Sequence, residues 1–439
     1  DVPKPMLKVL GEPMLEWVIS ACEDAGIGEM CIVKGYRGEV IDQYLNGRYQ
    51  TVIQAERLGT GHAVMQTEPF LKNNIEGNTL VLCGDAPFID SYTINKALEL
   101  HKAQGNAVTV ITAELENPHG YGRIIRCGDG ISGIVEEKDA NENQKSIKEV
   151  NSGAYWFNTK SLIEMLGKLT CNNSQNEYYL TDTVGIAVSD GKKAGAYKSE
   201  NPRVILGAND RKGLLELNNI ARMDVIEKHL ENGVEFACLD GVVIERNVEI
   251  GAGTEVLLGT ILRNGTKIGT NCRIGPNCLI EKCQVGNDVS LNYVQAFKSV
   301  IDAGVKIGPW VHIRPNSHIA SGVKIGDFVE IKNSEIGEKT AIAHLTYVGD
   351  SDVGKSVNFG CGTVTVNYDG IIKSRCEIGD SCFIGCNTNL IAPVKLGKGV
   401  YTAAGTTITR DVPDYALAID RGVMKINDGY SLRKLQGKF

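Results

Sequence analysis

An aspartate that follows a short apolar strand is the first residue in this sequence that is placed for chemistry. The apolar run from Asn78 to Cys83 ends in Gly84 and Asp85. In a sheet covered by helices, ligands bind beyond the carboxyl ends of the strands, so this carboxylate can meet a substrate. A carboxylate there suits a hard divalent cation such as Mg²⁺, which prefers oxygen ligands. Asp85 could equally be only a turn-capping residue.

A histidine in the second half of the chain is the candidate acid–base group. His344 lies close to Thr346 and Tyr347 in the sequence. An unperturbed imidazole has a pKa of about 6.5, which suits it to accept a proton near neutral pH. Spacing alone would favour a structural role for this histidine. Arg314 and Lys332 are cations in the same half of the chain, and by themselves each could be a solvated surface charge.

The thirteen cysteines do not form a metal-binding pattern. None are spaced C-x-x-C, and Cys272, Cys278 and Cys283 recur at intervals near six. That interval predicts wall positions of a repeat rather than zinc ligands. An odd number of cysteines in this pattern favours reduced thiols in a cytoplasmic protein.

The first 210 residues predict alternating strands and helices. Helical apolar spacing is found over Met14–Ala25, and a second helix is expected over Tyr92–Ala103. Short apolar runs predict strands at Met30–Val33, Asn78–Cys83 and Ala107–Thr112. This alternation is typical of an α/β fold, here Rossmann-like, with a mostly parallel sheet covered by helices.

A long amphipathic helix is expected next, from Asp210 to Asn232. Its apolar residues recur mostly at three- and four-residue intervals between charged residues. Asn209 or Asp210 can cap its start, and Gly233 can end it. We interpret this helix as an arm that joins two domains.

From about residue 242, apolar residues recur every six residues. The interval holds without a miss at Ile250, Val256, Leu262, Ile268, Ile274 and Ile280. Later runs begin at Ile301, Ile336 and Ile378. A period of six fits neither a helix nor a single exposed strand. It predicts a three-sided β-solenoid in which every sixth side chain points inward and Gly or Asn takes a left-handed corner.

Breaks in this period mark places where loops could carry a site. The phase slips near residues 281–300, 332–336 and 349–377. His312 and His318 lie six residues apart within the repeat. We expect these two histidines to be stacked wall positions of the solenoid.

Composition excludes several classes of function. The 439 residues include 46 Lys and Arg and 53 Asp and Glu, which gives a formal net charge of −7. This balance argues against a general binder of nucleic acid or of anionic membranes, since both need a basic field. No segment approaches the roughly 18 uninterrupted apolar residues of a membrane span.

Three segments resemble a known enzyme family. Gln54–Ala63, which reads QAERLGTGHA, resembles the uridine-binding segment of sugar-nucleotide pyrophosphorylases. Ala343–Asp350 (AHLTYVGD) and Val366–Gly370 (VNYDG) resemble the acetyltransferase half of a bifunctional family. That family comprises the N-acetylglucosamine-1-phosphate uridylyltransferases that are also glucosamine-1-phosphate N-acetyltransferases. The resemblance runs from the start of the chain to near Arg421.

The resemblance implies an order of domains and of reactions. A uridylyltransferase domain would span residues 1–209, a linker helix 210–232, and an acetyltransferase domain with its tail 233–439. The second domain would be a left-handed parallel β-helix. Acetyl transfer from acetyl-CoA to glucosamine-1-phosphate would precede uridylyl transfer from UTP, with release of pyrophosphate. The product, UDP-N-acetylglucosamine, would serve the peptidoglycan and lipopolysaccharide of a bacterial cell wall, and the enzyme would be cytoplasmic.

For uridylyl transfer, the resemblance implies that Mg²⁺ binds Asp85 and Asn209. Asn209 could instead only cap the long helix, or do both. Gln54, Gly59 and Thr60 would read the uracil. The full set of implied nucleotide and sugar contacts is Lys4, Gln54, Gly59, Thr60, Cys83, Gly84, Asp85, Gly122, Glu136, Asn151 and Asn209.

Within that set, Gly122, Glu136 and Asn151 would hold the sugar, and Lys4 would contact phosphates. Glu136 and Lys4 could each also be an ordinary exposed charge. The family places a strand and a glycine-rich loop before the Asp-x-Pro-Lys segment, and this sequence starts within that segment, at Asp1. We therefore expect its natural start to be missing, and the chain as it stands to be a poor uridylyltransferase.

For acetyl transfer, the resemblance implies that His344 is the general base for the attacking amine. The acceptor sugar phosphate would contact Arg314, Lys332, Tyr347, Asn358 and Lys373. The donor acetyl-CoA would contact Cys361, Asn367, Tyr368, Cys386, Ala404 and Arg421. Cys361 and Cys386 replace the usual Ala and Ser, so donor affinity or turnover should fall if the Ser hydroxyl matters. Neither cysteine needs to be a nucleophile, because direct amine attack requires no acyl-enzyme.

The resemblance also implies a homotrimer with acetyl-CoA in a groove between chains. The tail from Asp411 to Phe439 would reach a neighbouring chain. The partners would be small-molecule substrates, with no nucleic acid and no membrane. Two alternatives stay open: a hexose-1-phosphate nucleotidyltransferase whose solenoid only assembles subunits, and a trimeric scaffold with both sites decayed.

Overall fold

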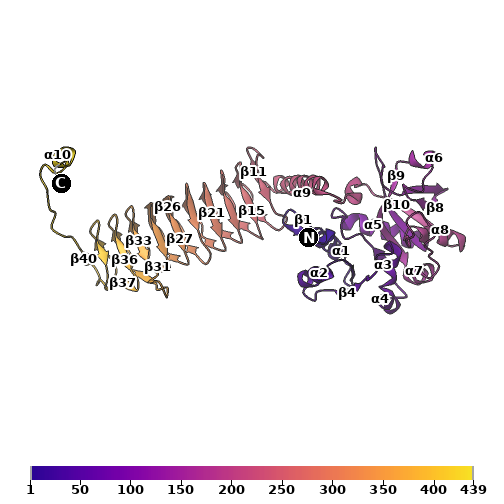
Figure 1. The fold of residues 1–439 in the computed structure, drawn as a ribbon, viewed down its shortest axis with the longest axis horizontal. Coiled ribbons are helices and arrows are strands. Elements are labelled where there is room, and N and C mark those ends of the chain that lie inside the picture. The colour runs from indigo at the N-terminus through magenta and orange to yellow at the C-terminus, as the bar shows by residue number, and fades with distance from the viewer. Residues whose placement is uncertain (1, 438–439) are drawn as a thin grey trace. The chain divides into compact units, whose positions relative to one another are not determined.

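Residues 2–437 are described by the computed structural model, and the chain divides into two compact units between Ala221 and Arg222. This division falls inside the long helix α9 (Arg211–Glu231). Figure 1 shows helices and strands in the first unit and stacked short strands in the second. Asp1 and Phe439, which end the predicted domains, lie outside the described residues.

The first unit places helices and strands where the sequence predicts them. The predicted elements are α1 (Met14–Asp24), β3 (Cys31–Lys34), β5 (Asn78–Val81), α5 (Ser91–Gln104) and β6 (Val108–Glu114). The others are η1 (Lys4–Met6), β1 (Lys8–Val9), β2 (Glu12–Pro13), α2 (Gly38–Leu45), β4 (Gln50–Ile53), α3 (Thr60–Met65), α4 (Glu68–Asn73), β7 (Arg123–Cys127), β8 (Gly130–Val135), α6 (Glu142–Lys145), β9 (Glu149–Asn158), α7 (Thr159–Leu166), α8 (Asp182–Ser189), β10 (Ala194–Lys198) and η2 (Pro202–Ile205).

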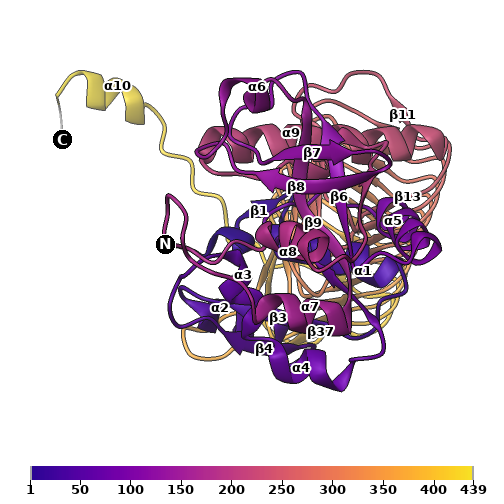
Figure 2. The ribbon, with the colours of Figure 1, turned by 90° about the vertical axis from the view of Figure 1, so that its right-hand side faces the viewer.

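The central sheet is mixed, whereas we expected a mostly parallel one. Its order is β10-β6-β9-β7-β8, with β5 also paired to β9, and β9 runs antiparallel to β5, β6 and β7. The β10–β6 pair is parallel, as is the separate β3–β4 pair. Strands β7 and β8 form a hairpin through Gly128 and Asp129 (Figure 2). A two-residue connection can join only antiparallel strands, so the expected alternation with helices stops after β6.

Helices pack on both faces of this sheet. Val108 and Val110 of β6 belong to one buried cluster, with Leu162 of α7. Ile111 of β6 belongs to a second cluster, with Ile94 of α5. Successive side chains of a strand point to opposite faces, so β6 is buried on both. The sheet that contains β5, the strand before Asp85, is therefore supported by packed side chains on both faces.

The second unit is a three-faced parallel β-solenoid (Figure 1). Face I contains β11 (Glu235–Phe236), β14 (Glu255–Val256), β17 (Arg273–Ile274), β20 (Ser290–Leu291), β23 (Lys306–Ile307), β26 (Lys324–Asp327), β29 (Ala341–His344), β32 (Asn358–Phe359), β35 (Phe383–Ile384), β38 (Tyr401–Thr402) and β40 (Leu417–Ala418). Face II contains β12 (Val243–Ile244), β15 (Ile261–Arg263), β18 (Leu279–Glu281), β21 (Val294–Phe297), β24 (Val311–Ile313), β27 (Glu330–Lys332), β30 (Tyr347–Gly349), β33 (Val364–Val366), β36 (Asn389–Ile391) and β39 (Thr407–Ile408). Face III contains β13 (Glu249–Ile250), β16 (Lys267–Ile268), β19 (Gln284–Val285), β22 (Val300–Ile301), β25 (His318–Ile319), β28 (Glu335–Ile336), β31 (Ser351–Val353), β34 (Cys376–Ile378) and β37 (Val394–Leu396). The tail carries a short helix, α10 (Tyr430–Leu435).

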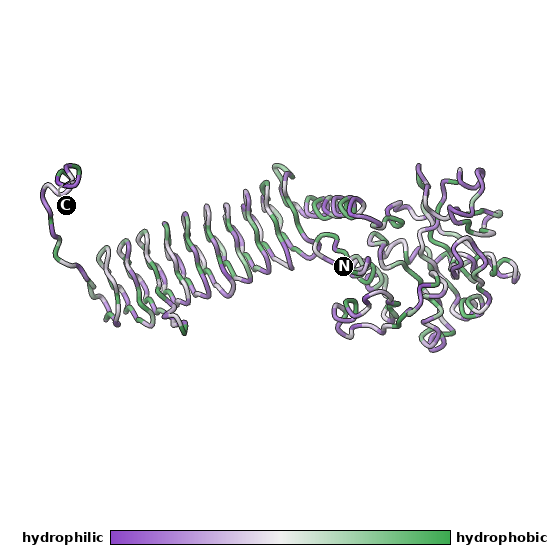
Figure 3. Tube along the Cα trace, viewed as in Figure 1, coloured by the Kyte–Doolittle hydropathy of each residue, from purple (hydrophilic) through white to green (hydrophobic). Residues whose placement is uncertain are grey.

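The sixfold apolar positions point into the solenoid, as the sequence predicts. Ile313, Ile331 and Val348 pair on successive coils of face II and are each 0 % exposed. Figure 3 shows apolar positions recurring along every coil. The expectation that His312 and His318 stack is wrong: residues six apart lie on adjacent faces, here on β24 and β25. The residue paired with His312 on the next coil is Glu330.

Glycines that follow inward isoleucines allow coils to pack closely. A Cβ added at Gly251 would lie 2.7 Å from the carbonyl carbon of Gly269 on the next coil. Left-handed backbone is found at corner residues such as Asn277, Tyr293 and Trp310. Gly and Asn do take left-handed corners as expected, for example at Gly253 and Asn277. Gly251 is not left-handed, and contact between coils is the reason for glycine there.

A long connection leaves the solenoid between β33 and β34. It spans residues 367–375, within the phase slip expected at 349–377. Its tip is exposed, at 87 % for Ile371 and 60 % for Ile372, and Asp369 Oδ1 accepts both of their backbone N–H groups at 2.8 Å.

No helix within residues 2–437 combines the length and the apolarity that crossing a membrane requires.

Candidate functional sites

A lysine ammonium lies between two oxygen-bearing side chains in the first unit. Lys4 Nζ is 2.6 Å from Asp85 Oδ2 and 2.6 Å from Asn209 Oδ1. Asp210 caps helix α9, because its Oδ1 accepts the N–H of Gly213 at 2.7 Å. Asn209 is thus free of the capping role that the sequence allowed. Three predicted site residues from distant parts of the sequence meet here.

The donor atoms of this cluster fit a hard divalent cation. Mg²⁺ prefers oxygen ligands and is commonly held by one or two carboxylates together with phosphate oxygens. Asp85 and Asn209 supply such oxygens, and the Lys4 ammonium already lies between them as a positive charge. In residues 2–437, no group of three or more His, Cys, Asp or Glu side chains could hold a metal. The other ligands of a cation at this cluster would be phosphate oxygens and water.

Cys83 and Gly84 lie between the end of strand β5 and Asp85. The Cys83 thiol donates to the carbonyl of Gly153, with a sulfur–oxygen distance of 3.6 Å. Burial, together with the charge of Asp85, raises the pKa of Cys83 to about 11, so the residue stays a neutral thiol. A Cβ added at Gly84 would meet Leu15 Cδ1 at 3.5 Å, an ordinary contact.

The residues expected to read uracil also come together. Gln54 Nε2 donates to the Gly59 carbonyl at 3.0 Å, and Thr60 Oγ1 accepts the N–H of Leu180 at 3.1 Å. Gly59 has a φ of +102°, and an added Cβ would lie 2.6 Å from the Tyr178 carbonyl oxygen. Only glycine fits both conditions, so the loop before α3 can approach a flat ligand closely.

The three expected sugar contacts lie side by side. The N–H of Asn151 donates to the Gly122 carbonyl at 2.9 Å. A Cβ added at Gly122 would lie 3.5 Å from each carboxylate oxygen of Glu136. Burial raises the pKa of Glu136, although a hydrogen bond from Thr181 opposes the shift. Glu136 is therefore not the solvated surface charge that the sequence also allowed.

In the second unit, the predicted base and three predicted donor contacts occupy one corner of the solenoid. This corner column, between faces I and II, consists of His344, Cys361, Cys386 and Ala404. The members take the same position on successive coils, because each is linked to the next coil by the same backbone bond. The N–H groups of Gly362, Asn387 and Gly405 donate to the carbonyls of His344, Cys361 and Cys386 at 3.2, 2.7 and 2.7 Å. Sequence spacing did not show this alignment.

His344 is exposed at the end of β29. Its carbonyl accepts the Thr346 hydroxyl at 2.7 Å, which fixes the backbone at the corner. The imidazole faces solvent and not the dry interior. His344 is therefore not buried in the wall of the solenoid, and it is accessible to a substrate.

A buried carboxylate organises the polar corner between faces II and III. Asp350 is 4 % exposed, and its Oδ2 lies 2.8 Å from Lys332 Nζ. Asn333 Nδ2 donates to its Oδ1 at 2.5 Å, and Asn367 donates to its Oδ2. Burial raises the pKa of Asp350, but the hydrogen bonds from Asn333, Lys332 and Asn367 outweigh it and hold the pKa below its ordinary value. Asn367 also lies 3.4 Å from the Tyr347 hydroxyl.

Arg314 lies one coil from Lys332 at the same corner. Its N–H donates to the Ile331 carbonyl at 2.8 Å. Its guanidinium is 42 % exposed and pairs with Glu330 Oε1 at 2.9 Å. A guanidinium has five N–H donors, so this pair leaves donors for a bound anion.

Four predicted site residues lie apart from this corner within one chain. Asn358 is exposed on β32 of face I. Tyr368 and Lys373 form an isolated bridge in the projecting connection. Arg421 is exposed beyond β40, the last strand of face I.

Sequence reasoning missed Asp350 and Gly349. A Cβ at Gly349 would overlap the Tyr347 phenol and lie 2.8 Å from Asn367 Nδ2. Both residues stand in the AHLTYVGD segment that carried the resemblance. An acidic residue between Lys332 and Asn367 in the repeat was the available signal, but its burial needs the folded corner.

Comparisons with known proteins agree with both units. Residues 1–202 match the nucleotidyl transferase family. Residues 298–333 and 375–410 match the bacterial transferase hexapeptide (six repeats) family, and 241–272 match the hexapeptide repeat of succinyl-transferase.

Curated relatives match nearly the whole chain. "Bifunctional protein GlmU" of Acetivibrio thermocellus is 46 % identical over 98 % of this chain and 94 % of its own length. The proteins of the same name from Thermoanaerobacter pseudethanolicus and Streptococcus agalactiae serotype V are 47 % and 43 % identical, each over 99 % of this chain and over 94 % and 95 % of their own lengths. The chain belongs to the GlmU family.

Membership of the GlmU family fixes the class of the molecule. The chain is a bifunctional transferase, with a nucleotidyltransferase domain followed by a left-handed β-helix of hexapeptide repeats. A solenoid used only for assembly does not account for relatives that are named bifunctional. This fold class is the one that the sequence predicts, apart from the mixed sheet.

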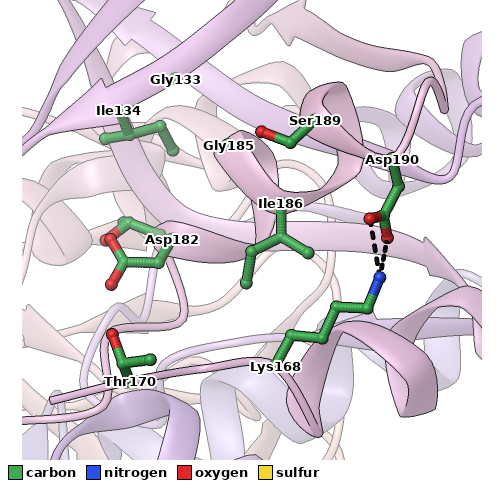
Figure 4. Close-up of a pocket in the computed structure, with 10 residues that line it drawn as sticks. Gly133, Ile134, Lys168, Thr170, Asp182, Gly185, Ile186, Ser189 and Asp190 are labelled. Carbon is green, nitrogen blue, oxygen red and sulfur yellow. Dashed lines mark hydrogen bonds and ion pairs between the residues drawn. The ribbon is translucent and has the colours of Figure 1, made fainter.

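A cavity of about 460 Å³ is found in the first unit of this GlmU-family chain (Figure 4). Lys168 Nζ donates to both carboxylate oxygens of Asp190 across its rim, at 2.7 and 2.6 Å. Thr181, which also lines it, donates to Glu136. None of the predicted site residues is among the described residues that line this cavity.

Proposed function

We propose that this GlmU-family chain makes UDP-N-acetylglucosamine in two steps. It transfers acetyl from acetyl-CoA to glucosamine-1-phosphate, and then uridylyl from UTP to N-acetylglucosamine-1-phosphate with release of pyrophosphate. The observation that carries the proposal is the arrangement around face II. An exposed imidazole stands at one corner of this face, and two cations ordered by carboxylates stand at the other.

In acetyl transfer, glucosamine-1-phosphate lies across face II. Arg314 and Lys332 bind its phosphate, which leaves its amine toward His344, with Tyr347 beneath the sugar. His344 takes a proton as the amine nitrogen attacks the thioester carbonyl carbon. The tetrahedral intermediate then expels the CoA sulfur, which receives the proton from the imidazolium. No acyl-enzyme is needed.

The corner column binds the donor. Neighbouring strands lie about 4.8 Å apart, so Cys361, Cys386 and Ala404 rise from His344 as a row of small side chains. An extended thioester arm fits along such a row. Asn367 and Tyr368 lie beside the thioester, and Arg421 offers a charge to the donor phosphates.

In uridylyl transfer, the first unit positions UTP and the sugar phosphate. Asp85 and Asn209 would hold Mg²⁺, which would supply neutralisation of phosphate charge. Lys4 contacts the phosphates from the same cluster. The remaining contacts are Gln54, Gly59 and Thr60 to the uracil, Gly122, Glu136 and Asn151 to the sugar, and Cys83 and Gly84 beside Asp85.

We also propose a homotrimer. An apolar column, defined as Tyr293, Trp310, Phe328 and Leu345, follows the corner between faces I and II. Its members are 38–62 % exposed, and the ring centroids of Tyr293 and Trp310, and of Trp310 and Phe328, are 5.6 and 5.2 Å apart. All four adopt positive φ, which is costly for bulky residues. An exposed apolar ladder of this kind is typical of a surface that another copy buries.

The trimer also accounts for residues that one chain leaves apart. Asn358, Tyr368, Lys373 and Arg421 reach substrates from a neighbouring chain, with acetyl-CoA in the groove between chains. The tail beyond Asp411 contacts the neighbour. Its apolar residues support this role, because Val423 is 92 % exposed and Met424 is 80 % exposed.

The remaining proposals concern domains and location. The functional domains are residues 1–209 and 233–439, joined by the helix over 210–232. The enzyme works in the cytoplasm, where UTP and acetyl-CoA are made and where its thiols stay reduced.

Acetylation of glucosamine-1-phosphate by acetyl-CoA, with the product identified by mass spectrometry, tests the proposal. His344→Gln should lower kcat by about 10²- to 10⁴-fold, because the amine loses its base. His318→Gln is the matched control, since this half-exposed solenoid histidine pairs with Asp302 and Glu335 at face III and its loss should leave kcat unchanged. Normal acetylation by the His344 variant would remove the base from the proposal.

A further inference from the structure

Two cysteines of the corner column are directly stacked. β32 and β35 pair Phe359 with Ile384, and the bonds Gly360 N–H to Ile384 O and Asn387 N–H to Cys361 O, both 2.7 Å, carry this register to Cys361 and Cys386. Neighbouring strands are about 4.8 Å apart, and disulfide-bonded cysteines usually have Cα atoms about 4.4–6.8 Å apart. The two backbones are therefore within bonding range.

Both thiols are accessible, unlike most thiols of the solenoid. Cys386 is exposed and Cys361 is partly exposed, whereas Cys272, Cys278, Cys283, Cys376 and Cys382 are buried. Burial raises the pKa of Cys376 to about 11, and the pKa values of Cys278 and Cys283 to about 11. Thiolates are the reactive form, so these buried residues are poor partners for an oxidant.

We propose that Cys361 and Cys386 are an oxidation site that closes the donor side of the acetyltransferase. Hydrogen peroxide accepts two electrons and two protons from the two thiols, its O–O bond breaks to give two waters, and one sulfur–sulfur bond forms between adjacent coils. A dithiol reductant reverses the step. The bond draws the two side chains out of their parallel stacking and changes the wall along which the donor lies. This consequence rests on the proposed function, because it needs acetyl-CoA at the corner column.

Mapping the cross-link tests the chemical step in the full chain. Reduced protein is treated with hydrogen peroxide, alkylated and digested with trypsin. Cys361 falls in the peptide Ser356–Lys373, and Cys386 falls in Cys376–Lys395 together with Cys376 and Cys382. Fragment ions should join Cys361 to Cys386 within one chain. A bond to Cys376 or Cys382 instead, or no bond, would overturn the proposal.

Variants test whether the stacking of Cys361 and Cys386 is what permits the cross-link. Cys361→Ser and Cys386→Ser should each abolish the cross-link, whereas Cys127→Ser, which removes an exposed thiol of the first unit, should leave it intact. Cys361→Ala combined with Ala404→Cys moves the pair one coil along the column. That double variant should form a bond from Cys386 to the introduced thiol, and failure to do so would contradict the role of stacking.

Acetyl transfer is then measured for the same sample before oxidation, after oxidation and after dithiothreitol. We expect at least a tenfold loss and its recovery, and slower cross-linking when acetyl-CoA is present. A cross-link that leaves acetyl transfer unchanged would overturn the closing role. Reduced protein without acetyl transfer would instead contradict the proposed function, while the mapped bond would still decide whether the thiol pair is an oxidation site.

Discussion

At the scale of single residues, charge and burial decide which groups can work. Asp350 is buried and holds Lys332, Asn333 and Asn367 through its two oxygens. Its charge is stabilised by these donors, so its pKa lies below the ordinary value. One carboxylate thus fixes the positions of Lys332 and Asn367, which are proposed to bind the acceptor phosphate and to lie beside the thioester.

Asp350→Asn should destabilise the second unit and impair acetyl transfer. Removing one partner leaves the ammonium of Lys332 buried without its counter-charge, which costs about 3–5 kcal/mol in buried pairs. Because folding lowers the pKa of Asp350, its stabilisation is complete above about pH 4 and disappears as pH falls through the folded-state pKa. Urea unfolding at several pH values should show a difference from wild type that is large at pH 7 and shrinks in acid.

Asp352→Asn is the control for this prediction. Asp352 is 49 % exposed and pairs with Arg375. An exposed pair contributes about 0–1 kcal/mol, so this variant should stay close to wild type. Equal losses for both variants would contradict the organising role of Asp350.

At the scale of elements, the short strands act only as members of a stack. A strand of two or three residues has few hydrogen bonds of its own, and its stability comes from inward side chains and from the coils on either side. Ile274 on β17 is 0 % exposed between Val256 and Leu291 of the neighbouring strands. The mixed sheet of the first unit follows the same logic, since β9 buries its residues between β6 and β5.

Ile274→Ala should lower the free energy of unfolding of the solenoid by about 2–5 kcal/mol, because it leaves a cavity that rigid coils cannot fill. Urea unfolding followed by circular dichroism measures the change. Val300→Ala removes an apolar side chain that is 41 % exposed and should cost far less. Similar losses at the two positions would show that Ile274 does not face a packed interior.

At the scale of the whole molecule, the exposed apolar column is the surface that the proposed trimer would bury. The apolar column exposes four bulky side chains beside the corner column, and both follow from the register of faces I and II. Covering one column with another copy places that copy next to His344. Assembly and acetyl transfer are therefore expected to be lost together.

Trp310→Lys should break the trimer and with it acetyl transfer, because a charge cannot be buried in an apolar interface without a partner. Light scattering after size exclusion measures the mass of the assembly, and the acetyl-CoA assay measures the activity. Tyr92→Lys changes an aromatic residue of the first unit that is 53 % exposed and should leave both unchanged. A fully trimeric Trp310 variant would show that the apolar column is not the interface.

Periodicity alone determined the solenoid and much of the α/β unit. Apolar residues every six positions can be buried only if the chain turns between them, so the inward residues of all three faces could be predicted. The long helix and the strand before Asp85 followed in the same way from spacing. These features are local, because each depends on residues that are close in the sequence.

Only the tertiary structure showed which residues are neighbours in space. The sequence could not show that Lys4 lies between Asp85 and Asn209, that Asp350 is buried among amides, or that His344, Cys361 and Cys386 form one column. In the solenoid, these neighbours depend on how many residues each coil contains, and a coil shortened or lengthened by insertion shifts every later stack. In the first unit, they depend on which distant segments pack together. The first sheet is mixed and not mostly parallel as predicted, since pairing is set by contacts between distant segments and not by the pattern within any one of them.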